Sequence, residues 1–109
     1  MTHNVQPIYY RRRQTHKVNI GAGGIAIGGK SPILVQSMTD TPTADVEAST
    51  AQVLRLVRAG AGLVRLTAQT AHHAAALGDI RRHLDMVGCH VPLCADIHFN
   101  PAAAFEAAK

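Results

Sequence analysis

Two polar side chains near the end of the sequence are placed to act on one ligand. Asp96 and His98 are separated by one residue and follow the apolar run 91–95, so in an extended chain both side chains leave the same face. A carboxylate beside an imidazole can orient a ligand or transfer a proton. The alternative is that Asp96 caps the following helix and His98 makes a loop hydrogen bond. Spacing alone leaves both interpretations open.

A cation interrupts a second apolar run. Arg65 stands between Val64 and Leu66, where a charge is costly unless it has an anionic partner or reaches the open end of a sheet. An ion pair with Asp96 is one explanation and phosphate binding is the other. The planar guanidinium suits phosphate because it donates two hydrogen bonds at once, and the formal net charge of +4 favours an anionic partner. Neutral hydrogen-bonding groups follow the first apolar run, residues 33–35: Gln36, Ser37 and Thr39.

The cysteines and paired histidines do not predict a metal site. Cys89 and Cys94 are too few for a disulfide framework, and their spacing is wider than that of a usual zinc half-site. We interpret them as half-buried core thiols. His72 and His73 fall in one helical turn and face different directions.

The elements that position these groups form a repeating pattern. Three apolar runs end in polar residues, and helical segments separate them over residues 44–59 and 71–86. Pro101 then begins a further helix, with Phe105 as its large apolar anchor. This order predicts an α/β fold with a parallel sheet. An eight-fold barrel and an open doubly wound sheet both begin in this way. Thr43 and Thr70 are the predicted N-caps of the two helical segments, and Gly60 and Gly88 are their predicted C-terminal stops.

The segment before the repeat differs from it. Residues 17–20 and 25–27 alternate around a glycine-rich turn, which predicts a short β-hairpin. Residues 1–16 are polar and basic and form a predicted arm that packs on its own domain. A nucleic-acid-binding module working through residues 11–13 is the least favoured reading, because it leaves Arg65, Asp96 and His98 unexplained.

Length and composition exclude several classes. The chain has 109 residues, fewer than the roughly 250 of a complete eight-fold barrel, so a large architecture must be incomplete. With 47% hydrophobic and 17% charged residues, it is typical of a globular chain and not of a disordered one. No apolar stretch approaches the ~20 residues of a membrane span, and no secretory signal is recognisable, so we expect a cytoplasmic protein without a membrane partner.

Three strings in order carry a specific resemblance. Residues 35–41 read VQSMTDT, residues 62–67 read GLVRLT and residues 95–101 read ADIHFNP. Together they closely resemble the N-terminal region of the 4-hydroxy-3-methylbut-2-enyl diphosphate synthase family, the iron–sulfur reductases of the methylerythritol phosphate route to isoprenoids. The resemblance covers about residues 11–109, and three ordered motifs are far more specific than one.

The resemblance implies a fold and an activity. Residues 17–109 would form the first three β/α units of a TIM-type (β/α)8 barrel, preceded by the hairpin. A C-terminal domain, absent from this chain, would hold a 4Fe-4S cluster on three Cys and one Glu. The family opens the ring of 2-C-methyl-D-erythritol 2,4-cyclodiphosphate and removes water, with electrons from ferredoxin or flavodoxin. The resemblance also implies that the full-length protein is a homodimer and that the fragment alone is inactive.

The resemblance also assigns residues. Arg65 matches an arginine that contacts the substrate diphosphate, and Asp96 and His98 match groups beside the substrate that orient it or transfer protons. Gln36, Ser37 and Thr39 match the pocket wall. Cys89 and Cys94 match no cluster ligand, so the resemblance implies no metal ligand in this chain. A barrel similar to dihydropteroate synthase, which binds a diphosphate without a cluster, is the alternative.

Overall fold

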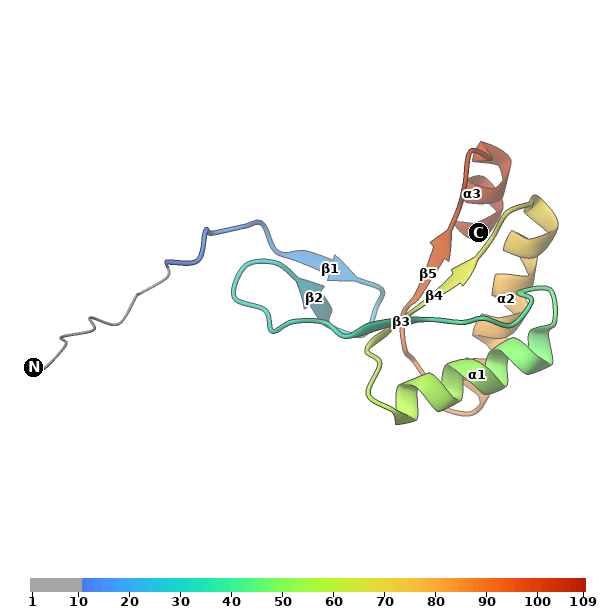
Figure 1. Cartoon of the computed structure of the whole chain (residues 1–109), viewed down its shortest axis with the longest axis horizontal. Coiled ribbons are helices and arrows are strands. Elements are labelled where there is room, and N and C mark those ends of the chain that lie inside the picture. Colours follow the sequence, from blue (N-terminus) through green and yellow to red (C-terminus); the bar gives the residue numbers. More distant parts are fainter. Residues whose placement is uncertain (1–10) are drawn as a thin grey trace, which may run out of the picture.

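The computed structural model describes residues 11–109 of the chain. Its first elements form a hairpin that projects from the rest of the described chain (Figure 1). Strands β1 (Val18–Ile20) and β2 (Ile25–Ile27) pair antiparallel, with Ile20 opposite Ile25. The connecting turn needs glycine because Gly21 and Gly24 have φ of 63° and 76°. The predicted hairpin is therefore confirmed.

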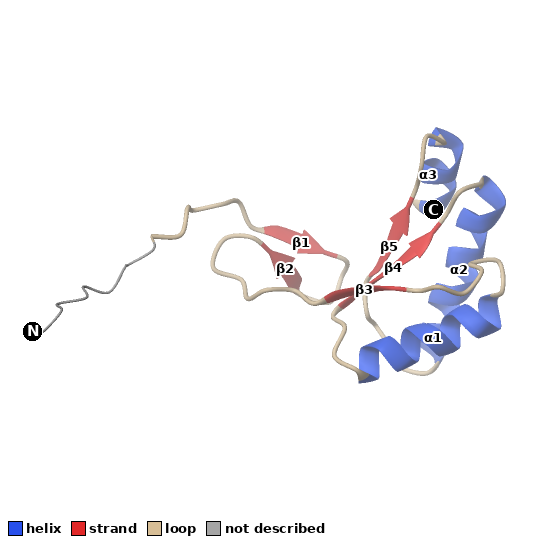
Figure 2. Ribbon diagram, in the orientation of Figure 1, coloured by secondary structure: helices blue, strands red, loops and turns tan. Residues whose placement is uncertain are grey.

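A parallel sheet and its helices form the main body. Strands β3 (Gln36–Met38), β4 (Leu63–Thr67) and β5 (Leu93–Asp96) lie in the order β3-β4-β5. Helices α1 (Val46–Arg58), α2 (Ala71–Met86) and α3 (Pro101–Ala107) follow the three strands in turn. All three helices lie on one side of the sheet (Figure 2). The predicted order of strands and helices is confirmed.

The core lies between the sheet and these helices. Val64 and Leu66 of β4, Val53 of α1 and Ile80 of α2 are all fully buried in this core. Because side chains alternate along a strand, Arg65 and Thr67 must leave β4 on the opposite face. The sheet thus has a helix-covered face and an open face, and the open face carries Arg65 and Thr67 of β4 together with Asp96 of β5. No helix in residues 11–109 is long and apolar enough to cross a bilayer.

The first strand differs from the prediction. Residues 33–35 do not form a buried strand, since Ile33 is 86% exposed and Val35 is 57% exposed. Pairing with β4 begins only where Gly62 N–H donates to the Val35 carbonyl, so the strand is Gln36–Met38. Within the described chain β3 is an edge strand, and an apolar run on an edge has too few neighbours to bury it.

The helix ends agree with the prediction except at α1. Thr70 caps α2 by accepting a hydrogen bond from His73 N–H, and Gly60 and Gly88 follow α1 and α2 with positive φ, as predicted. Helix α1, however, begins later than predicted, and its cap is Asp45, which accepts from Ala48 N–H. Thr43 is buried instead, with its hydroxyl 3.2 Å from that of Thr67.

The predicted anchor of α3 is wrong. Phe105 is 75% exposed, whereas Ala103 is fully buried and Ala107 packs against the core. Ala103 and Ala107 are one turn apart and form the packing face, so Phe105 between them points away from it. Small side chains allow α3 to approach α2 closely, which a phenylalanine on that face would prevent.

Candidate active site at the carboxyl edge of the sheet

Three side chains meet at the carboxyl edge of the sheet. Arg65 Nη2 lies 2.9 Å from Asp96 Oδ1, and His98 Nε2 lies 3.0 Å from the same oxygen. The Asp96 side chain is only 12% exposed, whereas those of Arg65 and His98 are 41% and 59% exposed. A nearly buried carboxylate therefore lies beside a guanidinium and an imidazole that both still reach solvent.

The strand register explains why these residues meet. Arg65 is opposite Cys94, and Thr67 is opposite Asp96, so Arg65 and Asp96 share the open face one layer apart. The long arginine side chain spans that step. The ion pair considered from the sequence is confirmed, and it leaves the other donors of the guanidinium available to a ligand.

The ion pair changes the acidity of both partners. The hydrogen bond from Arg65 lowers the pKa of Asp96, and the bond from His98 lowers it further, against the opposing effect of burial. The hydrogen bond and charge of Asp96 raise the pKa of Arg65. Asp96 is thus ionised at neutral pH and acts as an acceptor that holds both neighbours in place.

The position of Asp96 bears on the role of His98. A neutral His98 that carries its proton on Nε2 would direct that proton toward Asp96 Oδ1, 3.0 Å away, and would keep Nδ1 as an acceptor. An imidazole held in one tautomer by a carboxylate can take up or release a proton at the other nitrogen. Asp96 is not a helix cap: the capping position of α3 is Asn100, which makes no side-chain capping bond.

The three residues predicted after the first apolar run separate onto different faces. Gln36 is opposite Leu63 and lies on the open face, whereas Ser37 is opposite Val64 and lies on the helix-covered face, away from Arg65. Thr39 is buried, and its N–H donates to the Arg65 carbonyl. The structure therefore brings Gln36, but not Ser37, to the face that carries Arg65.

Met38 was missed by the sequence reasoning. It is opposite Arg65 on β3, shares the open face and is 41% exposed. Once the strand is placed at Gln36–Met38, alternation puts positions 36 and 38 on one face and 37 on the other. The sequence analysis placed the strand at residues 33–35, so this alternation could not be applied to Met38.

Helix α1 holds the loop between β3 and α1. Gln52 Nε2 donates to Asp40 Oδ1, and Gln52 Oε1 accepts from the N–H groups of Asp40 and Thr41. Ser49, fully buried, bonds the Thr41 hydroxyl and donates to the Pro42 carbonyl. The loop at the carboxyl end of β3 is therefore fixed by two helix side chains. Sequence reasoning missed them because their partners lie in a loop and have no periodic pattern.

Arg65 retains binding capacity. Its Nε is shielded from solvent and unpaired within residues 11–109, but the side chain as a whole is 41% exposed, so the exposed end of the guanidinium is the part open to a ligand. A guanidinium with unused donors at the carboxyl edge of a parallel sheet is suited to a phosphate oxygen.

The described residues do not form a cluster site. Residues 11–109 contain no group of three or more His, Cys, Asp or Glu side chains arranged to hold a metal ion, and Cys89 and Cys94 are free thiols. An iron–sulfur cluster therefore does not fit the residues described, and no step below is derived from one.

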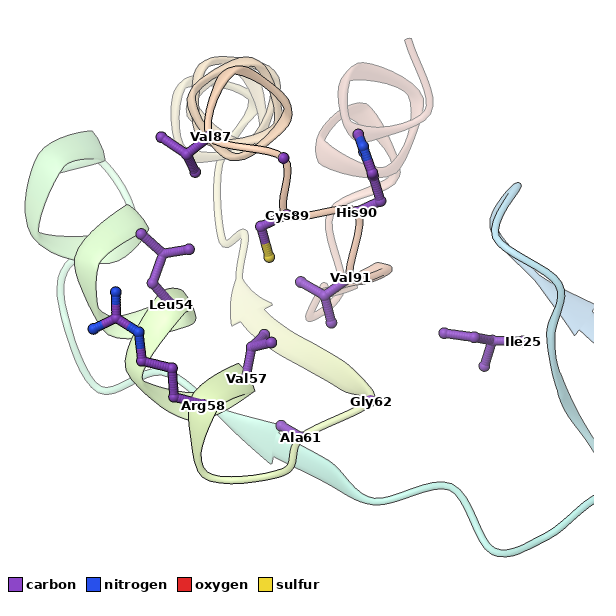
Figure 3. A pocket seen from close by; sticks show the side chains of 11 residues that line it. Ile25, Leu54, Val57, Arg58, Ala61, Gly62, Val87, Cys89, His90 and Val91 are labelled. Atoms are coloured by element: carbon purple, nitrogen blue, oxygen red, sulfur yellow. The ribbon is translucent and has the colours of Figure 1, made fainter.

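A hollow of about 450 Å³ lies at the opposite end of the sheet. Its lining is mostly apolar and comes from the ends of α1 and α2, from the segments that lead into β4 and β5, and from Ile25 of β2 (Figure 3). Arg58 and His90 are among the lining residues. In α/β folds this end serves packing, so the hollow is not the candidate site.

Comparison with known proteins decides the family. The family model of the GcpE TIM-barrel domain matches residues 15–109. The chain belongs to this family. A relative from Akkermansia muciniphila is 50% identical over 103 residues, and one from Bacteroides fragilis is 51% identical over 100. A third, from Leptospira interrogans, is 42% identical over 107. All three are named 4-hydroxy-3-methylbut-2-en-1-yl diphosphate synthase (flavodoxin).

The matches cover unequal shares of the two chains. They include 94%, 92% and 98% of this chain but 17%, 16% and 16% of the respective relatives. The chain thus spans about one sixth of the length of these GcpE-family proteins. The match confirms the family resemblance drawn from the three sequence motifs.

Proposed function

We propose that this chain forms the N-terminal part of the (β/α)8 barrel of a 4-hydroxy-3-methylbut-2-enyl diphosphate synthase. The reaction takes 2-C-methyl-D-erythritol 2,4-cyclodiphosphate, two electrons and two protons to 4-hydroxy-3-methylbut-2-enyl diphosphate and water. The observation that carries the proposal is Arg65, whose side chain is 41% exposed at the carboxyl edge of a sheet whose sequence matches the family.

Arg65 binds the diphosphate in this proposal. Ring opening converts a bridging oxygen into a free diphosphate end, and a fixed guanidinium can stabilise the added negative charge. Asp96 holds Arg65 through the 2.9 Å ion pair, so that the guanidinium need not reorganise when the ligand arrives. Gln36 supplies a neutral hydrogen-bonding group on the same face, and Thr39 holds the β3 end against the Arg65 carbonyl. Ser37 supports the wall from the helix-covered face.

His98 is the proton-transfer group in this proposal. Asp96 Oδ1 lies 3.0 Å from its Nε2, so the protonated imidazole would deliver the Nδ1 proton to the departing hydroxyl, whereas the neutral imidazole would only accept from that hydroxyl and orient it. Asp96 itself remains ionised throughout because its pKa is lowered. This arrangement separates the two roles: the carboxylate positions and the imidazole exchanges the proton.

The remaining partners lie outside this chain. In this proposal the two electrons would come from a 4Fe-4S cluster, whose ligands are not among the residues described. The names of the relatives favour flavodoxin over ferredoxin as the donor. A homodimer and a cytoplasmic location belong to the same proposal. The barrel similar to dihydropteroate synthase is not favoured, because the relatives named above are all synthases of the first kind.

The test is an anaerobic assay of the protein expressed from its complete reading frame. Reduced flavodoxin and the cyclodiphosphate should give the linear diphosphate. Arg65→Ala should raise KM, whereas His98→Gln should lower kcat with a smaller change in KM. Arg58→Ala is the matched control, since Arg58 lies at the opposite end of the sheet. Absence of turnover together with absence of bound iron and sulfide would refute the proposal.

A further inference from the structure

One residue beside the candidate site has an unfavourable backbone. Phe99 has φ of 54°, and it is the only non-glycine residue with positive φ within residues 11–109. This left-handed conformation is uncommon for any side chain and is a clear outlier for a bulky one. Glycine adopts it without strain, and asparagine does so with little. The loop between β5 and α3 thus keeps a phenylalanine where the backbone disfavours it.

The ring of Phe99 gains nothing from packing within the described chain. It is fully exposed, with a relative accessibility of 103%. Its closest aromatic neighbour is His98, with ring centroids 6.5 Å apart and planes tilted by 60°. A strained backbone combined with an unburied ring cannot be explained by the stability of this part of the fold. Such outliers concentrate at ligand sites.

The position of Phe99 indicates what the ring would meet. Arg65, Asp96 and His98 form a continuous chain of contacts at 2.9 and 3.0 Å, and Phe99 is the next residue along the backbone. An anion held at Arg65 would have Asp96 and His98 beside it, and the Phe99 ring follows, with its centroid 6.5 Å from that of the His98 ring. That order suits a ligand with a charged end and a hydrocarbon body.

We propose that Phe99 is a specificity-determining residue whose ring covers the carbon skeleton of the diphosphate held at Arg65. The proposal rests on the proposed function and deepens it. Arg65 would recognise the diphosphate in any ligand, whereas Phe99 would distinguish an organic diphosphate from inorganic pyrophosphate by burying apolar surface.

The test compares two ligands in the protein expressed from its complete reading frame. Calorimetry measures Kd for inorganic pyrophosphate and for 2-C-methyl-D-erythritol 2,4-cyclodiphosphate. Phe99→Gly should weaken cyclodiphosphate binding about tenfold, equivalent to ~1.4 kcal/mol, and change the pyrophosphate Kd by less than about twofold. Phe99→Asn, which also tolerates positive φ, should give the same pattern and serves if the glycine variant does not fold. Phe105→Ala, at another exposed phenylalanine, should change neither Kd.

Stability provides a second readout. Removing the strained side chain should leave hydrogen exchange in β5 unchanged or slower, although ligand binding weakens. Faster exchange in β5 with both variants would assign Phe99 a packing role and overturn the proposal. Equal changes in the two Kd values, or no change in either, would overturn it as well. If the unsubstituted protein bound neither the cyclodiphosphate nor pyrophosphate, the proposed function would fail, and this proposal would fail with it.

Discussion

The loop that leads into β5 depends on one arginine. Arg81 of α2 donates from Nη1 to the Val91 carbonyl and from Nη2 to the Cys89 carbonyl, each at 2.6 Å, and from Nε to Asp85 Oδ1 at 3.0 Å. These bonds fix the start of the strand whose other end carries Asp96. Replacing Arg81 with Ala should therefore loosen β5 along its length.

The contacts set the size of the effect. A hydrogen bond from a charged donor contributes about 1.5–3 kcal/mol when shielded, and the loss of two such bonds leaves carbonyl groups without partners. The Arg81 side chain is 31% exposed, so water replaces part of the lost hydrogen bonding. We therefore expect Arg81→Ala to lower the free energy of opening β5 by ~3 kcal/mol. At ~1.4 kcal/mol per factor of ten, local opening of β5 should become about 100-fold more frequent.

Hydrogen exchange measured by mass spectrometry reads this opening directly at residues 93–96. Arg82→Ala is the matched control: the adjacent arginine is 71% exposed and pairs only with Asp79 within the described chain, so its removal should change exchange by less than about threefold. The exchange rate of Arg81→Lys should lie between those of Arg81→Ala and Arg82→Ala, because an ammonium cannot bond both carbonyls in the geometry of the guanidinium. Equal exchange in the Arg81→Ala and Arg82→Ala proteins would refute the reasoning.

Three further predictions follow from single sites. Gly28→Ala should abolish exchange protection of the hairpin, because an added Cβ would clash with the His16 carbonyl oxygen and φ there is 81°. Asp45→Ala should cost ~1 kcal/mol in the free energy of unfolding by removing the α1 cap, whereas Thr43→Ala should leave α1 protection unchanged, as amide exchange in α1 would show. The lowered pKa of Asp96 means that its ion pair stabilises the fold above the ordinary carboxyl pKa and is lost as pH falls through the lower folded value. In Asp96→Asn, the free energy of unfolding should therefore fall less steeply as the pH drops below about 4. An unchanged pH dependence would contradict the stabilising role of the Arg65–Asp96 ion pair.

Local patterns in the sequence predicted much of the fold. Glycines at turns, the Thr70 cap and the alternation of apolar runs with helical stripes depend on neighbouring residues, and the structure confirms them. The predictions for Phe105 and for residues 33–35 failed for a shared reason: hydrophobicity does not say whether a neighbouring element is present to cover a side chain. Ala103 is buried because the core beside α3 has room only for a small side chain, and the sequence of α3 does not show how much room there is.

The candidate site was predicted in part. Arg65 stood out because a charge within an apolar strand requires a partner, and Asp96 is that partner. The two-residue spacing of Asp96 and His98 correctly placed both on one face. The positions of Ser37 and Met38 relative to the sheet depended on strand register, which a single sequence does not specify. The clamp from Gln52 to Asp40 joins a helix to a loop, so no periodic pattern could reveal it.

Binding of inorganic pyrophosphate tests the central claim most directly. Calorimetry on the protein expressed from its complete reading frame should show binding that weakens roughly 10- to 100-fold in Arg65→Ala, as expected for the loss of a charged hydrogen-bonding group. Arg58→Ala should bind as the unsubstituted protein does. If Arg65→Ala bound pyrophosphate with unchanged affinity, the carboxyl edge of this sheet would not be the diphosphate site.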